Sequence, residues 1–394
     1  MSAEALVVGG GPAGAALATL LARAGRPVTL VEREAGPHDK VCGEFVSGEA
    51  AAYLGGLGLD LARLGAVPIR RVRLTARGEP AEAALPFPAF SLSRRGLDEA
   101  LLGLAAEAGV ALRRGRKVKN LAPQDGGWRA IIDGGPAVEA KTAFLATGKH
   151  DLKGLKRPPG LHGGLVGFKL HLRLTPAQTD ALAETVELHL FPGGYAGLEP
   201  IEDGLANLCL VVGRNELDGG SAWTELLQSL VIDCPLLGAR LADAEPRWPK
   251  PLAISAIPYG HVAATAEDGL WRLGDQAAVI PSFAGDGLGI ALHSAHAAAA
   301  AYLAGNGAAA FQRQLAIDLG PRVKGAALLS RLLVQPWAQG LAMGLTRLRP
   351  QLLSAAAAHT RIPKKALERL RPAPVRPGKA GNIPPSGRRS DCPA

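Results

Sequence analysis

The residues best suited to bind a nucleotide lie near the start of the chain, in the run Val8-Gly9-Gly10-Gly11-Pro12-Ala13-Gly14. In such a run Gly9 makes a tight turn, Gly11 lets the backbone approach a pyrophosphate, and Gly14 lets a helix pack closely on a strand. Glu32 follows at about the 20-residue spacing of a carboxylate that holds a ribose hydroxyl. The pattern predicts a dinucleotide site, and a glycine-rich helix start without a ligand is the alternative.

The segments around this run have the periodicity that such a site requires. Residues 5–8 form an apolar run that predicts a buried strand, 12–24 predict a helix closed by Gly25, and 28–31 predict a second strand that ends at Glu32. The helix N-terminus would offer free N–H groups to the phosphate charge. We therefore predict an α/β nucleotide-binding domain.

A second set of residues far along the chain indicates which dinucleotide is bound. A predicted strand at 270–273 runs into Gly274-Asp275, and Gly285-Asp286-Gly287-Leu288-Gly289 then opens an alanine-rich helix. The acid suits a sugar-like hydroxyl, and the second glycine turn suits another polar ligand end. FAD presents two such ends, whereas NAD-dependent dehydrogenases usually close their cofactor site within one contiguous domain. The pattern therefore favours FAD.

These motifs, together with Arg94-x-x-Leu97-Asp98 and Ala146-Thr147-Gly148, resemble those of FAD-dependent oxidoreductases. The group includes geranylgeranyl reductases, aromatic hydroxylases similar to p-hydroxybenzoate hydroxylase, and flavin halogenases. The resemblance covers roughly the first 320 residues. It implies a Rossmann-like FAD-binding domain of the glutathione reductase type, an inserted, mostly antiparallel β-sheet substrate domain, and C-terminal helices.

The resemblance also implies roles for individual residues. Glu32 would bind the adenosine ribose, Arg94 would lie against the FAD, and Asp275 would hold the ribityl chain. The helix that begins near Gly287 would point its positive end at the flavin pyrimidine edge. Simpler alternatives are a solvated charge for Arg94 and an ordinary cap for Asp275. The residues predicted to bind the cofactor are Gly9, Gly11, Pro12, Ala13, Gly14, Glu32, Arg33, Arg94, Ala146, Gly148, Gly274, Asp275, Gly285, Gly287, Leu288 and Gly289.

The domains are predicted to interleave. Segments 1–70, 91–160 and 262–320 are assigned to the FAD-binding domain, 71–90 and 161–261 to the substrate domain, and 321–394 to C-terminal helices and a disordered basic tail. Apolar and polar residues alternate over 168–174, 186–190 and 208–212, with a candidate extra strand at 69–75, and this period of two predicts strands. His171 and His189 fall on the polar phase, which predicts surface residues; a substrate-facing position is the alternative.

The first candidate catalytic loop is Lys40-Val41-Cys42-Gly43-Glu44. In reductases of the resembling family a loop rich in cysteine and glycine occupies this stretch, and Glu44 stands where a glycine is common. Cys42 could position substrate or relay a proton, and a small buried thiol is the equal alternative. Glu44 could serve as an acid or base if burial raises its pKa, but a solvated acid is the favoured interpretation.

The second candidate is the stretch 191–200. It resembles the Gly-Tyr-x-Trp-x-Phe-Pro wall of the geranylgeranyl reductase cavity, but Gly197 replaces the tryptophan and Glu199 the phenylalanine. The resemblance then implies a wider, more polar cavity, which counts against a C20 isoprenoid substrate. Tyr195 could donate a hydrogen bond to a substrate carbonyl or phenol, and a packed aromatic is the alternative.

The absence of two motifs reduces the number of reaction types that the sequence favours. The run 147–154 lacks the Asp-Gly-x-x-Ser-x-x-Arg pattern of hydroxylases that take NADPH directly, and no tryptophan-rich halogenase wall is evident. We predict hydride transfer between flavin and a lipophilic unsaturated or phenolic, isoprenoid- or polyketide-like molecule. A monooxygenase acting on an aromatic or polyketide-like ring is the second candidate, and a lipid or quinone carrier with a structural FAD is the third. Without a second nucleotide fingerprint, electrons would come from a transient NAD(P)H or a separate donor such as a flavin reductase.

Composition agrees with a globular enzyme. The 394 residues are 47% hydrophobic and 20% charged, and the four cysteines have no metal or disulfide spacing. The cysteine spacing predicts no metal site. Because no leader precedes the first strand, we expect a cytoplasmic protein, with membrane association as the alternative. The formal charge of +9 is concentrated after position 360, which favours a disordered tail over a nucleic-acid site. An apolar stripe at 323–345 predicts core or dimer packing, with peripheral membrane contact as the alternative.

Overall fold

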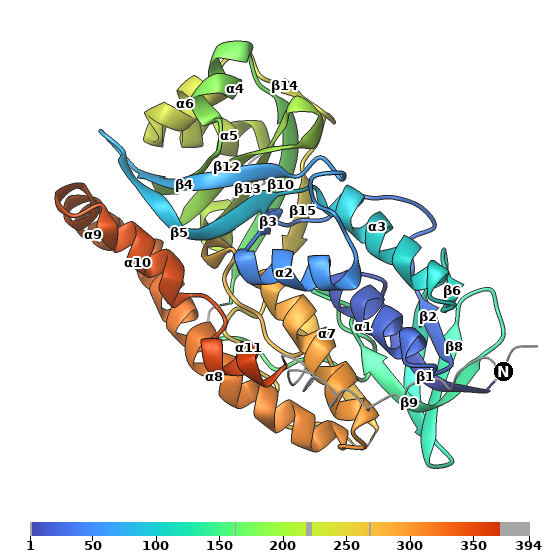
Figure 1. Cartoon of the computed structure of the whole chain (residues 1–394). Helices are drawn as coiled ribbons and strands as arrows, with labels where there is room; N and C mark the ends of the chain where they lie inside the picture. The colour runs from blue at the N-terminus through green and yellow to red at the C-terminus, as the bar shows by residue number, and fades with distance from the viewer. Residues whose placement is uncertain (1, 162, 218–222, 268, 371–394) are drawn as a thin grey trace, which may run out of the picture.

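The protein is described from a computed structural model that covers residues 2–161, 163–217, 223–267 and 269–370. Two β-sheets and a set of helices form its frame (Figure 1). The predicted disordered tail lies outside the described residues from position 371 onward.

The first sheet carries the N-terminal glycine run. Its strand order is β6-β2-β1-β9-β8-β7, and β16 pairs with β9. The bounds are β1 (Ser2–Val8), β2 (Val28–Val31), β6 (Ala111–Arg113), β7 (Val118–Gln124), β8 (Gly127–Ile132), β9 (Val138–Leu145) and β16 (Leu270–Arg272). The pairs β1·β2, β1·β9, β2·β6 and β9·β16 are parallel. All of the side chains of 5–8 are buried, as expected of a parallel strand covered on both faces.

Three helices lie together beside this sheet (Figure 1). They are α1 (Pro12–Arg23), α3 (Arg94–Glu107) and α7 (Gly287–Leu303), and α1 packs against the other two. The small residues of α1 and α7 make this possible, because a helix rich in alanine lets another backbone approach closely. Helices drawn from the beginning, middle and end of the sequence are thus brought into one layer.

The second sheet has nine strands in the order β14-β10-β13-β12-β11-β4-β5-β3, with β15 on β10. The bounds are β3 (Phe45–Val46), β4 (Val67–Thr75), β5 (Ala81–Ser91), β10 (Leu165–Arg173), β11 (Thr185–Phe191), β12 (Gly194–Ile201), β13 (Leu205–Gly213), β14 (Glu245–Pro246) and β15 (Leu252–Ser255). Among its pairs only β11·β4 is parallel within the described residues. The predicted strands, including the one at 69–75, are confirmed.

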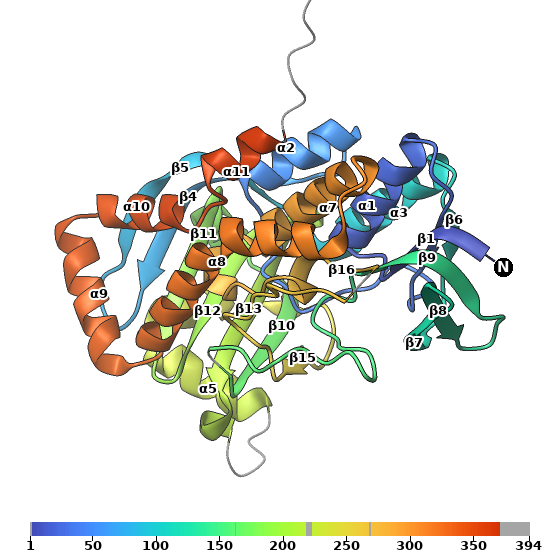
Figure 2. The same cartoon turned by 90° about the horizontal axis from the view of Figure 1, so that it is seen from below.

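The remaining helices cover the flanks. They are α2 (Gly48–Leu57), α4 (Pro176–Leu182), α5 (Trp223–Asp233), α6 (Pro235–Leu241), α8 (Ala308–Leu333), α9 (Pro336–Leu348), α10 (Gln351–His359) and α11 (Lys364–Arg369). Figure 2 shows α8 to α11 along one side of the molecule, with α9 and α10 beside β4 and β5. The predicted α/β fold with an inserted sheet and C-terminal helices is confirmed. No helix among the described residues is both long and apolar enough to cross a bilayer.

Two expectations about burial were wrong. His171 and His189 are buried rather than on the surface, because both faces of β10 and β11 are covered. The apolar side chains of β10 face α5 and α6, and its polar side chains face the loop that ends at Glu44. For the stripe at 323–345, the prediction of core packing was wrong at Leu328, Trp337 and Leu341, which are all exposed, and dimer packing stays a prediction.

Candidate active site

A cavity of about 590 Å³ lies where the carboxyl ends of β1, β9 and β16 meet the loop before β3. The predicted cofactor residues that line it are Gly9, Gly11, Pro12, Ala13, Glu32, Arg33, Arg94, Ala146, Gly148, Gly274, Asp275, Gly285, Gly287 and Leu288. Ligands of open α/β sheets bind at this edge because adjoining parallel strands all end there. The other two predicted residues, Gly14 and Gly289, lie outside the lining.

The glycine turn is shaped by close backbone contacts. Gly9 has a φ of +105°, and a Cβ there would collide with the carbonyl oxygen of Ala146. A Cβ at Gly14 would collide with the carbonyl oxygen of Gly9, so Gly14 serves helix packing. No side chain of the described residues caps the N-terminus of α1, which leaves N–H groups of its first turn for an anion. This cradle fits a pyrophosphate.

Glu32 is buried at the end of β2. Its two carboxylate oxygens accept hydrogen bonds from the N–H groups of Gly10 (2.6 Å) and Glu34 (3.0 Å). Each oxygen keeps a lone pair for a further donor such as a ribose hydroxyl. The carboxylate therefore holds the glycine turn in place and remains able to accept from a ligand.

Arg94 begins α3 and lies in the cavity wall. Its Nε and Nη2 each donate to Asp98 at 2.9 Å, and Lys40 Nζ donates to the same carboxylate at 2.8 Å. These bonds fix the guanidinium in the wall, so Arg94 is not a solvated charge at a helix start. Its contact with FAD remains a prediction.

Glu44 is the centre of a buried polar cluster. Its carboxylate accepts hydrogen bonds from Lys169 Nζ, from His171 Nε2 (2.7 Å) and from the N–H of Arg94 (2.7 Å). Burial alone would raise the pKa of Glu44, but Lys169 and His171 together lower it below its ordinary value. Glu44 is thus neither a solvated acid nor an acid with a raised pKa. It is a buried carboxylate paired with a cation.

The backbone of Glu44 explains why a glycine is common at this position in the resembling family. Its φ is +62°, in the left-handed region that costs a non-glycine residue of order 1 kcal/mol or more. The side-chain contacts with Lys169 and His171 offset that cost. Sequence patterns alone did not find Lys169, which lies in a strand 125 residues away.

The oxygen and nitrogen atoms of Asp39, Glu44 and His171 lie close enough together to hold a metal ion, within 4.8 Å of one another. Lys169 Nζ contacts both carboxylates, binding Glu44 and lying 3.9 Å from Asp39. The ammonium group therefore already supplies the positive charge that a metal would bring.

The loop that carries Cys42 is fastened from two sides. Asn207 Nδ2 donates to the carbonyl oxygens of Cys42 (3.2 Å) and Gly43 (3.0 Å), and Lys149 Nζ donates to that of Val41 (2.8 Å). The Cys42 thiol is half-buried and lines the cavity. Whether Cys42 positions a substrate or relays a proton remains a prediction.

A second, narrower cavity of about 150 Å³ opens from the first. The two share the residues Gly43, Phe45, Cys209, Ser282 and Gly285. The floor of the second cavity is β12, whose Tyr195, Gly197 and Glu199 all face it, and its far wall comes from β4, β5, α8 and α10. Most of its lining is apolar. The geometry places a site for a narrow apolar ligand beside the end of a dinucleotide cavity.

Tyr195 takes part in a chain of hydroxyl groups. Its oxygen lies 2.9 Å from Ser282 Oγ, and Tyr259 binds the same Oγ at 3.1 Å. Burial raises the pKa of Tyr195 well above its ordinary value, and the nearby Tyr259 adds to the rise, so both phenols stay protonated. Ser282 lies at the junction of the two cavities. Neither Ser282 nor Tyr259 belongs to a motif that the sequence analysis identified.

Known proteins resemble this chain in sequence and fold. The sequence profile of the FAD binding domain family matches residues 2–142. Digeranylgeranylglycerophospholipid reductase 2 of Methanopyrus kandleri is 30% identical over 308 residues, 73% of this chain and 74% of that protein. The chain belongs to the FAD-dependent oxidoreductases of the geranylgeranyl reductase type.

Other relatives of this FAD-dependent oxidoreductase are more distant. A menaquinone reductase of Mycobacterium tuberculosis is 26% identical over 319 residues, 76% of each chain. The solved structure of the myxobacterial chondrochloren halogenase CndH has a TM-score of 0.72 at 19% identity, covering 94% of this chain and 95% of that one. The halogenase PltM bound to phloroglucinol and FAD has a TM-score of 0.68 at 17% identity, covering 84% and 75%. These two structures share the fold.

FAD is the cofactor of this oxidoreductase, and the cavity fits it. The glycine cradle, Glu32 and the start of α7 supply donors and acceptors at both ends of the 590 Å³ cavity. The bound flavin would supply a hydride or accept one.

Proposed function

We propose that this oxidoreductase reduces a lipophilic, unsaturated or phenolic small molecule by hydride transfer from FAD. The single observation that carries the proposal is the apolar cavity that opens from the dinucleotide cavity at Gly43, Cys209 and Ser282. A hydride acceptor must stack close to the flavin, and a ligand in this cavity would reach the junction. The names of two relatives, a menaquinone reductase and a digeranylgeranylglycerophospholipid reductase, agree with reduction of a lipophilic molecule.

Three side chains are assigned to this site. Cys42 would position the substrate at the junction, Tyr195 would hold a substrate oxygen through its hydroxyl chain with Ser282, and Glu44 would act as a fixed negative charge. Electrons would come from a transient NAD(P)H or from a separate flavin reductase, since no second nucleotide fingerprint is visible in the sequence.

The test is anaerobic. The FAD-loaded protein is reduced with dithionite, and reoxidation of the flavin is followed by its absorbance after adding an isoprenoid quinone, an isoprenoid alkene or oxygen. We expect the lipophilic acceptor to reoxidise the flavin without oxygen. A peroxyflavin-like transient with oxygen, and no reaction with the acceptors, would instead favour the monooxygenase.

A variant that fills the apolar cavity tests the binding of substrate without disturbing the binding of FAD. Gly197→Trp adds a side chain toward the cavity, because a Cβ at Gly197 has no contact closer than 3.7 Å. We expect this variant to keep its FAD and lose at least tenfold in the rate of reoxidation by the lipophilic acceptor. Gly103→Trp, the same change on the exposed face of α3, is the control. Equal rates in both variants would refute the assignment of the cavity.

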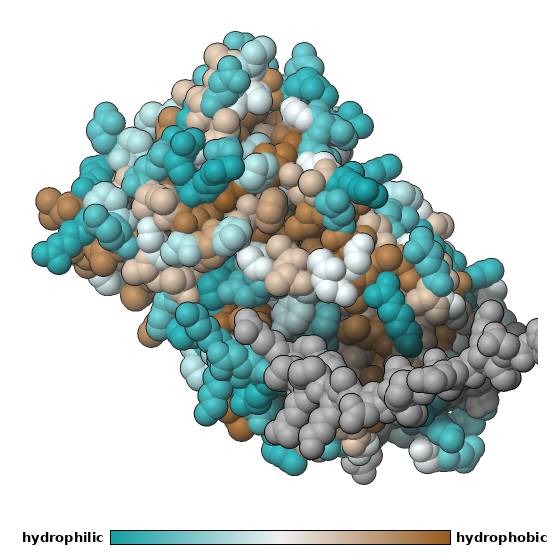
Figure 3. All heavy atoms as spheres, in the orientation of Figure 1, coloured by the Kyte–Doolittle hydropathy of each residue, from teal (hydrophilic) through white to brown (hydrophobic). Residues whose placement is uncertain are grey.

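We also propose that the apolar face of α8 to α10 docks on a lipid bilayer. Trp337 is 65% exposed and Leu348 is 82% exposed. Hydrophobic residues gather at the end of the molecule that carries α9 (Figure 3). The exposed apolar residues of this face are Leu328, Leu329, Leu332, Trp337, Leu341, Leu345, Leu348 and Leu352.

Two features favour a bilayer as the occupant of this face. The exposed Arg331 and Arg349 lie among its apolar residues, which suits anionic lipid headgroups. Leu329 belongs both to the face and to the lining of the narrow cavity, so a lipophilic substrate could enter from the membrane.

Sedimentation with vesicles of phosphatidylcholine and phosphatidylglycerol tests the docking. We expect the full chain to bind, and the double variant Trp337→Glu, Leu341→Glu to lose at least tenfold in affinity. Ile232→Glu is the matched control, because Ile232 is an exposed apolar residue on α5. If the face instead joins two copies of the chain, the wild type will be a dimer by light scattering and the double variant a monomer.

A further inference from the structure

Glu199 is a carboxyl group in the wall of an otherwise mostly apolar cavity. It lies on β12 in line with Tyr195 and Gly197, since alternate residues of a strand share a face. In the motif that the stretch 191–200 resembles, a phenylalanine stands where this chain has Glu199, so the resemblance implies an acid in place of an apolar wall residue. Gly197 leaves the space between Tyr195 and Glu199 open.

The carboxyl group of Glu199 has no ion-pair partner among the described residues. It is 3% exposed, and neither of its oxygens makes a hydrogen bond. The Ser91 hydroxyl lies near enough to Glu199 to lower its pKa as a hydrogen-bond donor would, although the pair falls outside the distance and angle of an ordinary hydrogen bond. Leaving such a group unpaired costs of order 1–3 kcal/mol, so its presence requires an explanation.

The groups around Glu199 favour its neutral form. Burial raises the pKa of Glu199 well above its ordinary value, the Ser91 hydroxyl acts in the opposite direction, and the negative Glu44 raises the pKa further. Cys42 also acts to raise it, and Lys169 to lower it. The pKa values of these two carboxyls near the same junction are thus shifted in opposite directions: Lys169 and His171 lower that of Glu44, and burial raises that of Glu199.

A protonated carboxyl differs from an ionised one in what it can bind. It carries an O–H donor, whereas a carboxylate only accepts. An apolar cavity whose lining includes one free O–H donor suits a ligand that is mostly apolar and carries one hydrogen-bond acceptor. Among molecules that a reduced flavin can reduce, a carbonyl conjugated to a double bond has this form.

We propose that Glu199 donates a hydrogen bond, and during reduction a proton, to the carbonyl oxygen of a conjugated enone or quinone whose apolar part fills the cavity. The proposal rests on the function proposed above and names its substrate class. The acceptor gains two electrons and one hydrogen as a hydride from the reduced flavin, and its carbonyl oxygen gains the proton of Glu199. The product is an enol or a hydroquinone, and water returns a proton to the Glu199 carboxylate.

The test compares two acceptors on the reduced, FAD-loaded protein without oxygen. One is a prenylated 1,4-naphthoquinone, which carries the carbonyl; the other is geranylgeraniol, which has double bonds but no carbonyl. We expect Glu199→Gln to slow reoxidation by the quinone about 100-fold, the lower range for loss of a general acid. The wild-type rate with the quinone should fall as pH rises through the pKa of Glu199, and Glu199→Gln should not show that fall.

The protonation of Glu199 can also be measured without catalytic turnover, so that the proposal does not depend on activity alone. Infrared difference spectra of wild type and Glu199→Gln should show the band of a neutral carboxylic acid in the wild type alone, and that band should shift when the quinone binds to the oxidised holoprotein. Glu139→Gln, on the exposed side of β9, is the control for the substitution itself. The flavin absorbance and the thermal midpoint report whether each variant folds.

The outcomes separate the two proposals. If neither acceptor reoxidises the wild type, the proposed function fails, while the infrared band and its shift still test Glu199. If both acceptors reoxidise wild type and Glu199→Gln at equal rates, or if the acid band is missing, the reductase stands and the role of Glu199 is refuted.

Discussion

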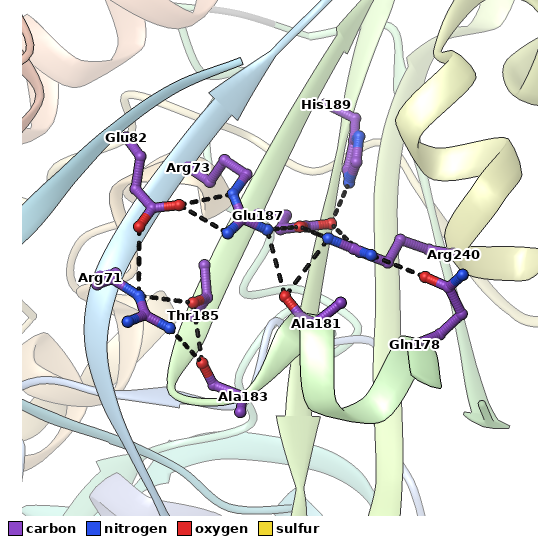
Figure 4. Close-up of polar contacts among 10 residues, drawn as sticks. All are labelled: Arg71, Arg73, Glu82, Gln178, Ala181, Ala183, Thr185, Glu187, His189 and Arg240. Atoms are coloured by element: carbon purple, nitrogen blue, oxygen red, sulfur yellow. Dashed lines mark hydrogen bonds and ion pairs between the residues drawn. The ribbon is translucent and has the colours of Figure 1, made fainter. Parts of the chain in front are cut away.

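Two buried glutamates, Glu44 and Glu187, have similar hydrogen-bond partners but lie in different positions relative to the cavities. Glu187 accepts hydrogen bonds from Arg73, Arg240 and His189 on the second sheet (Figure 4). Glu44 likewise has a cation and a histidine as partners, Lys169 and His171. Glu44 lines the 590 Å³ cavity, and Glu187 lines neither of the two cavities described above.

The comparison shows that a buried ion network is not by itself a site. Around Glu187 the network continues into structural contacts: Arg240 also binds Gln178, and Arg73 also binds Glu82 (Figure 4). The first contact joins α6 to α4 and the second joins β4 to β5, and Glu187 on β11 lies between them. Around Glu44 the same chemistry holds a strained loop against a cofactor cavity.

The largest effect is expected from breaking the Glu187 network. Glu187→Ala leaves Arg240 buried without its carboxylate, and loss of one partner of a buried pair costs about 3–5 kcal/mol. We expect the free energy of unfolding, measured in urea, to fall by that amount. Glu139→Ala on an exposed strand position should change it by less than about 1 kcal/mol.

Acid should act on the same network. Burial would raise the pKa of Glu187, but His189 and Arg240 lower it to about 2. Because the pKa is depressed in the folded state, the stabilisation is complete above the ordinary value near 4.5 and is lost as pH falls through about 2. We expect wild-type stability to drop by about 3 kcal/mol over that window and Glu187→Gln to lose this part of the drop. If the free energy of unfolding fell equally with pH in the wild type and in Glu187→Gln, the acid sensitivity would not come from Glu187.

Replacing one cation in each network, Lys169 or Arg240, tests whether the networks of Glu44 and Glu187 differ in function. Lys169→Met and Arg240→Met each leave a buried carboxylate with fewer partners, so each should lower the free energy of unfolding by about 2–3 kcal/mol. Only Lys169→Met should also slow reoxidation of the reduced flavin by the lipophilic acceptor, by about tenfold, because only Glu44 borders the cavity. Stopped-flow absorbance of both holoproteins measures this. Equal slowing in both would make the Glu44 cluster purely structural.

The smallest effect is expected from Tyr195. Tyr195→Phe removes one hydrogen bond to Ser282, whose Oγ keeps Tyr259, so stability should fall by about 1 kcal/mol. If the hydroxyl holds a substrate oxygen, the KM for the lipophilic acceptor should rise several-fold, whereas Tyr259→Phe should leave it closer to the wild-type value because Tyr195 remains. A thermal melt and steady-state assays measure the two effects.

The sequence by itself predicted the residues of the glycine-lined cavity, because the parts of that cavity are local. The run from Gly9 to Gly14 requires small residues at fixed spacings, and a strand, a turn and a helix position them with little help from elsewhere. The same holds for the alternation that predicted the strands of the second sheet. Residues 274 and 285–289 could be assigned because they too follow a strand and open a helix.

Only the tertiary structure decided which polar side chains are buried together. The histidines at 171 and 189 looked like surface residues because period two reveals one apolar face and cannot tell whether the other is covered. Lys169 meets Glu44 across 125 residues, and Glu199 faces a cavity whose lining also includes residues of α8 and α10, where neither of its oxygens makes a hydrogen bond. Such pairings, and the lack of one, depend on distances in space that no local pattern of residues encodes.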